Sequence, residues 1–143
     1  MRGKRRKKLV ASLVLAGLIG IGVGVLRYLE APRNVLQHAL NLQKLPPSLD
    51  NLKMGSDVWG DEVRGFYFDV AAEEFPLLLT GRSYEEEDVN TTFRGTFVAR
   101  TIHVSPPVSF PARWRYRWQT EGATLEILTD EKRHRVIARF SAN

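Results

Sequence analysis

The feature that most constrains this chain is an uncharged apolar run over residues 9–26. At ~1.5 Å per residue, a helix of this length spans about 27 Å, close to the ~30 Å hydrocarbon core of a bilayer. Tyr28 and Leu29 extend the run at its far end, and Tyr28 suits the headgroup level. The sequence therefore predicts a transmembrane helix over residues 9–29.

The charges on either side of this run predict its orientation. Residues 1–8 form a tail with six Lys and Arg, whereas only Arg27 and Arg33 follow the run closely. Positive charge stays on the cytoplasmic side of a membrane helix. We expect a single-pass cell-membrane protein with a signal-anchor, a cytoplasmic N-terminus and an extracytoplasmic C-terminal domain.

Two other interpretations of the apolar run remain open. A cleaved signal peptide also has a basic start, and residues 22–24 (Gly-Val-Gly) form an acceptable cleavage site. A mature N-terminus near Val25 would identify that case. The run can also be a helix buried in a protein core.

Small residues recur every four positions along the predicted helix, at Ser12, Ala16, Gly20 and Gly24. Such a stripe lets two membrane helices approach closely, which predicts self-association or packing on a membrane partner. Gly17 and Gly22 lie off the stripe, and glycine is common in membrane helices, so an incidental pattern is the alternative.

The net charge of +5 suggests nucleic-acid binding until it is divided along the chain. Removing the six basic residues of the tail and Arg27 from the 21 Lys and Arg leaves 14, against 16 Asp and Glu. Residues 28–143 are therefore slightly acidic, and we expect no nucleic-acid partner.

Residues 30–48 are predicted to form a juxtamembrane helix and a linker. Pro32 suits a first helical turn, the apolar residues that follow share one face, and residues 46–47 (Pro-Pro) end the segment. We expect this helix over residues 32–44.

After it come predicted strands at 49–54 and 62–70, a short helix at 72–80 and an exposed acidic loop at 83–90. In the second of these strands Phe66, Phe68 and Val70 share one face.

The C-terminal part alternates with a period of two. Strands are predicted at residues 91–100, 113–120, 124–129 and 133–141, and the last two form a hairpin through residues 130–132. The sequence therefore predicts that residues 49–143 form an α+β domain with a mainly antiparallel sheet of four or five strands and one or two covering helices.

The most unusual stretch is RWRYRW, residues 113–118. In a strand, Arg113, Arg115 and Arg117 share one face and the aromatic residues share the other. One interpretation is an aromatic core face with solvated arginines opposite. The other is a basic ladder, widened by Arg135 and Arg139, that binds an anionic lipid or polymer.

Charge is unevenly distributed in the predicted domain. Residues 57–88 hold ten acids and two arginines, whereas residues 94–139 hold nine Lys and Arg and four acids. The two parts can neutralise each other within one chain, or the acidic part of one copy can associate with the basic part of another.

Other sequence features give little indication of a catalytic, metal or cofactor site. Trp59, between two acids, can stack on a ligand or plug the core. The chain has no cysteine, and its histidines are scattered at His38, His103 and His134, so we expect no metal, no cofactor and no enzymatic activity.

The sequence thus favours a membrane-anchored accessory or scaffolding protein whose extracytoplasmic domain binds a protein partner from the membrane or envelope. The alternative is an envelope module that recognises an anionic lipid or polymer through residues 113–118.

Overall fold

The computed structural model describes residues 22, 31–57, 63–95, 97–98 and 108–142. The chain divides into two compact units, Met1–Val35 and Leu36–Asn143, and each is considered by itself. The predicted membrane helix lies outside the described residues except for Gly22, as does the stripe of Ser12, Ala16, Gly20 and Gly24. No helix within the described ranges is long and apolar enough to cross a membrane.

Helix α2 (Pro32–Ala39) is shorter than the helix predicted over residues 32–44. It ends because Asn41 adopts a left-handed conformation, with φ of 57°. The amide of Leu42 then donates a hydrogen bond back to the carbonyl of Gln37 at 3.0 Å, which is the Schellman pattern. This local cap ends the helix before the prolines that were expected to stop it.

The second half of α2 belongs to the core of the second unit. Leu36 and Leu40 are fully buried, and Ala39 is nearly so. These residues recur at helical spacing, so one face of the helix removes its apolar side chains from water together.

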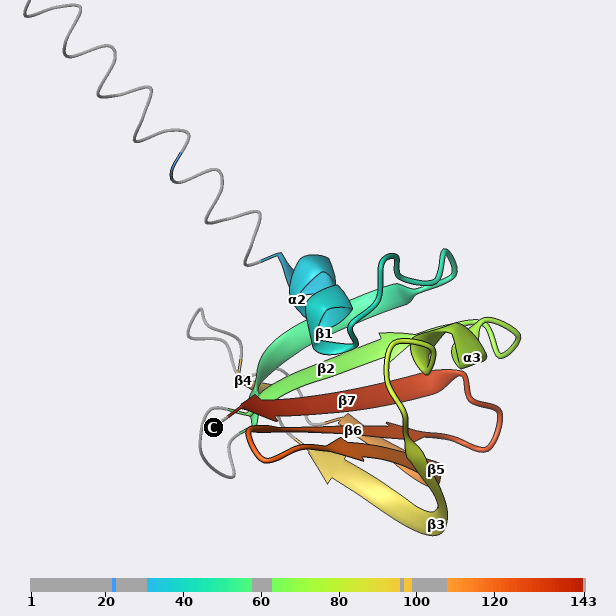
Figure 1. Ribbon diagram of the computed structural model, residues 1–143. Helices are drawn as coiled ribbons and strands as arrows, with labels where there is room; N and C mark the ends of the chain where they lie inside the picture. Colours follow the sequence, from blue (N-terminus) through green and yellow to red (C-terminus); the bar gives the residue numbers. More distant parts are fainter. Residues whose placement is uncertain (1–21, 23–30, 58–62, 96, 99–107, 143) are drawn as a thin grey trace, which may run out of the picture. The chain divides into compact units, whose positions relative to one another are not determined.

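One antiparallel sheet contains every described strand, in the order β3-β5-β6-β7-β2-β1-β4 (Figure 1). The strands are β1 (Asp50–Asp57), β2 (Arg64–Asp69), β3 (Glu85–Gly95), β4 (Phe97–Val98), β5 (Val108–Gln119), β6 (Ala123–Thr129) and β7 (Arg135–Ala142). The α+β class and the antiparallel sheet are confirmed. The predicted strand number of four or five is too low for the part of the chain described, which contributes seven.

The predicted loop over residues 83–90 is wrong, although the acidic residues in it are exposed, as predicted. The acidic residues form the first half of β3, where Glu85 pairs with Arg117 and Glu87 with Arg115 of β5. The register shifts between Asp88 and Thr91, so a bulge separates this half of β3 from the rest of the strand. Acidic side chains are compatible with a strand here because arginines face them across the ladder.

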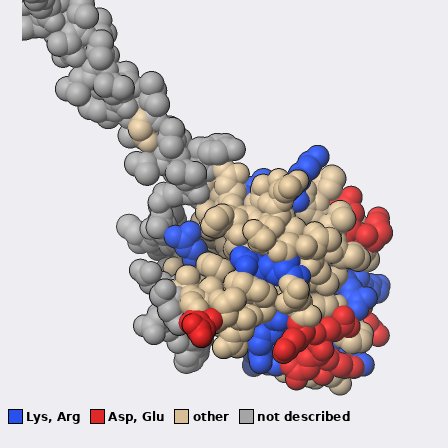
Figure 2. Space-filling view, in the orientation of Figure 1, with Lys and Arg blue, Asp and Glu red and all other residues tan. Residues whose placement is uncertain are grey.

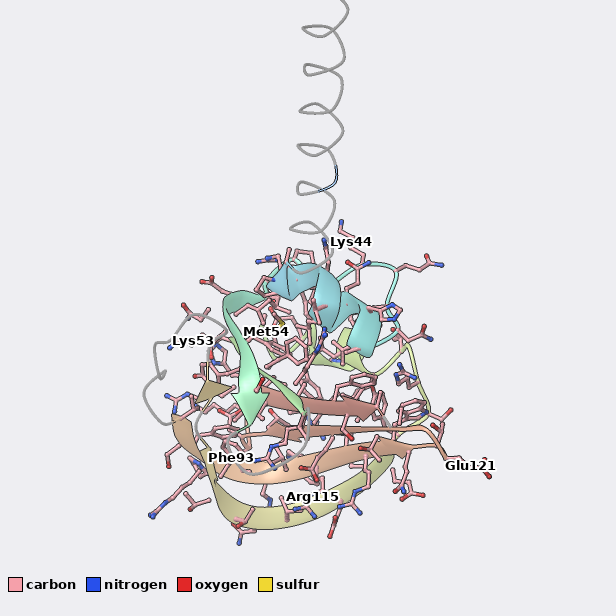
Figure 3. The ribbon with its side chains drawn as sticks, turned by 90° about the vertical axis from the view of Figure 1, so that its left-hand side faces the viewer. Lys44, Lys53, Met54, Phe93, Arg115 and Glu121 are labelled. Carbon is pink, nitrogen blue, oxygen red and sulfur yellow. The ribbon has the colours of Figure 1, made fainter. Side chains whose placement is uncertain are left out.

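The sheet curves strongly. Only residue 96 separates β3 from β4, yet these strands stand at opposite ends of the strand order. Because β4 pairs with β1 through Ser56 and Val98, the sheet must bend to bring its two ends towards each other. Figure 3 shows this curvature, with β1 and the β3–β5 pair on opposite sides of side chains that include Phe93.

Apolar side chains are buried on both faces of the central strands. On one face, Phe75 of the short helix α3 (Phe75–Leu78) packs against Tyr116, with ring centroids 5.4 Å apart. A second cluster joins Phe93 of β3 to residues of three other strands, which are Phe110, Ala112, Leu128 and Ile137. Strand β2 lies between these layers: Phe66 and Phe68, which were predicted to share one face, are buried, and Tyr67 packs against the second cluster.

Candidate functional site

The arginines of β5 are paired with acids of the neighbouring strands. Arg113 Nη2 lies 2.6 Å from Asp88 Oδ2, and Arg115 Nη1 donates a hydrogen bond to Glu87 Oε2 at 3.1 Å. Figure 2 shows acidic and basic side chains side by side over β3 and β5. For these pairs the uneven charge of the sequence is neutralised within one chain, so this part of the ladder is not a free basic surface.

A different arrangement surrounds Glu126 on β6. Its carboxylate lies within 4 Å of three guanidinium groups: 3.3 Å from Arg115, 3.7 Å from Arg117 and 3.8 Å from Arg139. The Glu126 side chain is only 24% exposed, so water screens these interactions less than it screens surface pairs. One carboxylate is thus shared by three guanidinium groups, of which Arg115 is also paired with Glu87.

The aromatic residues of β5 are engaged with other residues of the domain. Tyr116 is buried and accepts a hydrogen bond from Arg133 Nε at 3.0 Å, while Arg82 stacks over the Trp118 ring at 3.7 Å. Burial raises the pKa of the Tyr116 hydroxyl, and the hydrogen bond and charge of Arg133 oppose that rise. Trp114 lies 5.1 Å from the Arg133 guanidinium. These contacts favour the packing interpretation of the aromatic face.

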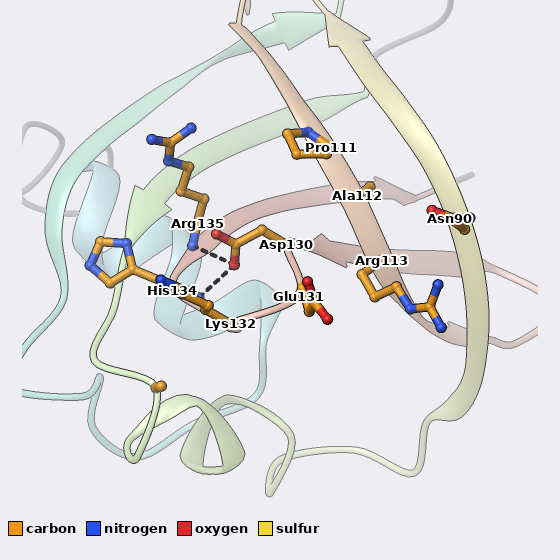
Figure 4. Close-up of a pocket in the computed structure, with 10 residues that line it drawn as sticks. Asn90, Pro111, Ala112, Arg113, Asp130, Glu131, Lys132, His134 and Arg135 are labelled. Carbon is orange, nitrogen blue, oxygen red and sulfur yellow. Dashed lines mark hydrogen bonds between the residues drawn. The ribbon is translucent and has the colours of Figure 1, made fainter.

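A broad hollow of about 730 Å³ lies beside the β6–β7 turn (Figure 4). We call it the turn hollow. Its polar lining includes Asn90, Arg113, Asp130, Lys132, His134 and Arg135, and Pro111 and Ala112 supply apolar surface.

The charges of the turn hollow are balanced. Asp130 is committed to the turn, since its Oδ1 accepts hydrogen bonds from the backbone amides of His134 at 2.8 Å and Arg135 at 3.2 Å. Glu131 also lines the hollow, and Arg113 is already paired with Asp88. An anion entering here would meet two carboxylates as well as the cations.

A smaller hollow of about 260 Å³ lies at the end of the sheet next to Glu126. We call it the Glu126 hollow. Arg117 and Gln119 of β5, Thr124 and Glu126 of β6, and Arg139 and Ser141 of β7 line it. Its polar lining contains one carboxylate and several hydrogen-bond donors.

The structure divides four of the five predicted arginines between these two hollows. Arg113 and Arg135 line the turn hollow, Arg117 and Arg139 line the Glu126 hollow, and Arg115 lies between them in the ion-pair network. Trp59 lies outside the described residues. Glu126 was not among the predicted site residues; the register of β6 and β7 places it opposite Arg139.

The described residues show little that points to catalysis or metal binding. His38 lies in α2 and His134 precedes β7, whereas His103 lies outside the described ranges. Among the residues that the structure describes, no group of three or more His, Cys, Asp or Glu is arranged to hold a metal ion.

Comparison of the chain with protein-family models, with curated proteins and with solved structures finds no match in any of the three. The candidate site therefore depends on its own geometry: a curved sheet with arginines clustered around Glu126.

Proposed function

We propose that this protein is a single-pass, membrane-anchored accessory or scaffolding protein that acts by binding rather than by catalysis. Residues 1–8 form its cytoplasmic tail, residues 9–29 its transmembrane helix, and the α+β domain is displayed outside the cytoplasm. Its partner is a membrane or envelope protein, or a second copy of the chain.

The observation that carries this proposal is the uncharged run over residues 9–26 directly after six basic residues. A run of this length is long enough to span the hydrocarbon core, and the charge asymmetry orients it. The first buried residue of the domain, Leu36, follows the run by only ten positions, which at ~3.5 Å per residue limits the tether to about 35 Å. Such a short connection suits a domain that works close to the membrane surface.

Membrane extraction tests the anchor. The full-length chain should stay in the membrane pellet after an alkaline carbonate wash, with peptides that include residues 1–8. Ile19→Arg should release much of it, because a central arginine costs ~2.5–3.5 kcal/mol on insertion scales. A soluble product with an N-terminus near Val25 would show instead that the segment is a cleaved signal peptide.

The stripe of small residues offers a test of helix packing with an internal control. Gly20→Leu and Gly24→Leu should reduce cross-linked dimers or co-purified membrane partner, because close helix approach requires small side chains. Gly17→Leu and Gly22→Leu make the same change off the stripe and should have little effect. Equal behaviour of the two pairs would remove the role of the stripe.

Co-purification in mild detergent tests the scaffolding role itself. A membrane or envelope protein recovered at a fixed stoichiometry, and retained at increasing salt, supports it. A chain that elutes alone and makes no cross-link in intact membranes contradicts it.

The convergence of three guanidinium groups on Glu126 favours a second candidate function. In it, the domain is an envelope module that recognises an anionic lipid or polymer through residues 113–118 and their neighbours on β7. Phosphatidylglycerol titrated into detergent micelles of the full chain should change its tryptophan fluorescence more than phosphatidylcholine does. Arg113→Glu, Arg115→Glu and Arg117→Glu together should abolish the difference, and an unchanged response would exclude this function.

A further inference from the structure

Strand β3 stands at one end of the strand order, so one of its two edges has no neighbouring strand among the described residues (Figure 1). The strand is 11 residues long, and its residues are exposed apart from Val89, Phe93 and Gly95. An edge of this kind presents peptide N–H and C=O groups with which another strand can pair. Two features of β5 identify the residues of β3 that carry these outward groups.

The first feature is the hairpin that joins β5 to β6. The amide of Thr120 donates to the carbonyl of Ala123 at 2.8 Å, and the peptide groups of β5 alternate between β6 and β3 from there. Arg115, five positions before Thr120, therefore bonds to β3, where the register places it opposite Glu87. The peptide groups on either side of Glu87 point away from β5, and they belong to Glu86 and Asp88.

The second feature is Pro111, which lies opposite Thr92. Proline has no N–H, so this pair exchanges no backbone hydrogen bonds, and the peptide groups of Thr92 point away from β5. Those of Arg94, two residues further along, do the same. Both residues are exposed, and within the described part of the chain neither makes a backbone hydrogen bond outside the strand ladders.

The outward groups of β3 are symmetric about Asn90. Two lie two positions away from it, at Asp88 and Thr92, and two lie four positions away, at Glu86 and Arg94. A second copy of β3, antiparallel to the first with a two-fold axis at Asn90, therefore places outward groups opposite outward groups. The bulge in β3 falls on this axis, so it separates the two sets of pairs and interrupts neither.

The charges of β3 favour the same arrangement. Its acidic residues occupy only the first half of the strand, so antiparallel pairing sets them against the second half, whereas parallel pairing would set acid against acid. Glu86 then faces Arg94 of the other copy, and Arg94 has no ion pair among the described residues. Charged side chains ordinarily keep other strands off an exposed edge. Here three of the four acids are already neutralised within the chain, by Arg113, Arg115 and Arg133.

We propose that two copies of this chain associate through β3 and form one continuous sheet across a two-fold axis at Asn90. The occupant of the edge is a second copy because the spacing of the outward groups and the distribution of charge are both self-complementary. Two anchored chains share one membrane, which raises their effective concentration at this contact. The inference rests on the proposed association of the chain with a second copy, and it names the surface that carries this association.

Cysteine cross-linking of the full chain in intact membranes tests the contact, because the chain has no cysteine of its own. Residues opposite each other in an antiparallel pair have Cα atoms ~5.5 Å apart, which a disulfide can span. Asn90→Cys, on the axis, should therefore form a disulfide-linked dimer under mild oxidation. Thr92→Cys alone should not, because the same residue of the other copy lies four positions away, about 14 Å along the strand. Glu121→Cys, exposed in the β5–β6 turn, is the control for random collision.

A mixed pair of variants tests the register independently. Thr92→Cys and Asp88→Cys chains with different tags, expressed together, should cross-link to each other more than either does to itself. This pair keeps the test valid if Asn90→Cys does not fold, since Asn90 has a left-handed backbone with φ of 38°.

Two substitutions test the backbone pairing and the charge pairing separately, in the Asn90→Cys chain. Thr92→Pro removes an outward N–H and no bond to β5, and Arg94→Glu sets an acid opposite Glu86. Each should lower the dimer yield by about threefold or more, whereas Arg94→Lys should preserve it. Thermal unfolding of each variant in detergent separates a lost contact from a lost fold.

The inference is overturned if Asn90→Cys and the mixed pair give no more dimer than Glu121→Cys. Equal yields from Thr92→Cys alone and from Asn90→Cys also overturn it, because they indicate a parallel or random contact. Cross-links from these positions only to a different protein overturn it as well, and leave the scaffolding function standing. A failure of the anchor is seen separately, in the carbonate wash, whereas a carbonate-resistant chain without these cross-links contradicts the β3 contact alone.

Discussion

Arg113 and Asp88 lie side by side across the β3–β5 ladder, with Nη2 and Oδ2 2.6 Å apart. Asp88 ends an acidic stretch that resembles a solvated loop, and Arg113 begins a basic stretch that resembles a ligand site. The strand pairing makes the two stretches complementary. Next to this ladder, three arginines converge on Glu126.

The Arg113–Asp88 pair should contribute modestly to stability. The two side chains are 37% and 44% exposed, so water screens them, and the expected coupling is ~0.2–1 kcal/mol. A double-mutant cycle with Arg113→Gln and Asp88→Asn, measured by urea unfolding, gives this coupling. Zero coupling would mean that strand register alone holds the two residues together.

Gly81 should not tolerate a side chain. A Cβ there would collide with the carbonyl oxygen of Leu40 and would lie 2.6 Å from that of Asn41, which are backbone atoms that cannot rotate away. Gly81→Ala should therefore lower the free energy of unfolding by about 1–3 kcal/mol. Gly122→Ala is the matched control, since its Cβ meets nothing within 4 Å, and it should change stability by less than ~0.5 kcal/mol. Similar losses from both variants would contradict the close approach.

The aromatic core of β2 should dominate stability. Phe68 is fully buried, and Phe68→Ala should cost ~3–5 kcal/mol through lost burial and a cavity. Leu77 on α3 is 47% exposed, so Leu77→Ala should change the free energy of unfolding by less than ~0.5 kcal/mol. Chemical unfolding of the two variants measures the difference, and comparable losses would refute the assigned burial.

Tyr84 should make stability sensitive to alkaline pH. Burial raises the pKa of its hydroxyl to about 12 from 10.0, with Arg82 opposing the rise. Because the folded state binds this proton more tightly, the stabilisation is complete below pH 10 and is lost as pH rises towards 12. Tyr84→Phe should remove that loss in urea unfolding at a series of pH values. The buried hydroxyl makes no hydrogen bond within the described structure, so this variant should be neutral or slightly stabilising at pH ~7.

Glu74 should make stability sensitive to acidic pH. The amide and hydroxyl of Ser48 both donate to its Oε2, at 2.9 and 2.6 Å, and these hydrogen bonds lower the pKa of the carboxyl from 4.5. Their stabilisation is present above pH 4.5 and disappears as pH falls through the lowered value. Glu74→Gln should therefore be less stable than the unaltered chain at neutral pH, with a difference that shrinks in acid. A pH-independent difference would show that the charge of Glu74 is not involved.

Local patterns in the sequence anticipated several elements of the domain. Period-two alternation located the β6–β7 hairpin and placed Phe66 and Phe68 of β2 on one buried face. These features depend on neighbouring residues, since turn chemistry and alternation act over a few positions. Helix ends were less predictable, because the stop of α2 depends on the left-handed backbone of Asn41.

The candidate site was only partly visible in the sequence. Arg113, Arg115, Arg117, Arg135 and Arg139 were selected as one patch because alternation places them on two strand faces. Their separation into two hollows depends on which acids face them, and those acids come from β3 and β6. The position of Glu126 between Arg117 and Arg139 follows from register across three strands.

By itself, the sequence determined the α+β class, the antiparallel pairing of its last strands and the charge asymmetry that predicts an anchor at residues 9–29. Only the tertiary structure decided that residues 85–88 form a strand, that the sheet curves until β4 meets β1, and that three arginines converge on Glu126. The reason is physical. Alternation and turns are encoded by adjacent residues, whereas strand partners and ion pairs are chosen by contacts between segments far apart in the chain.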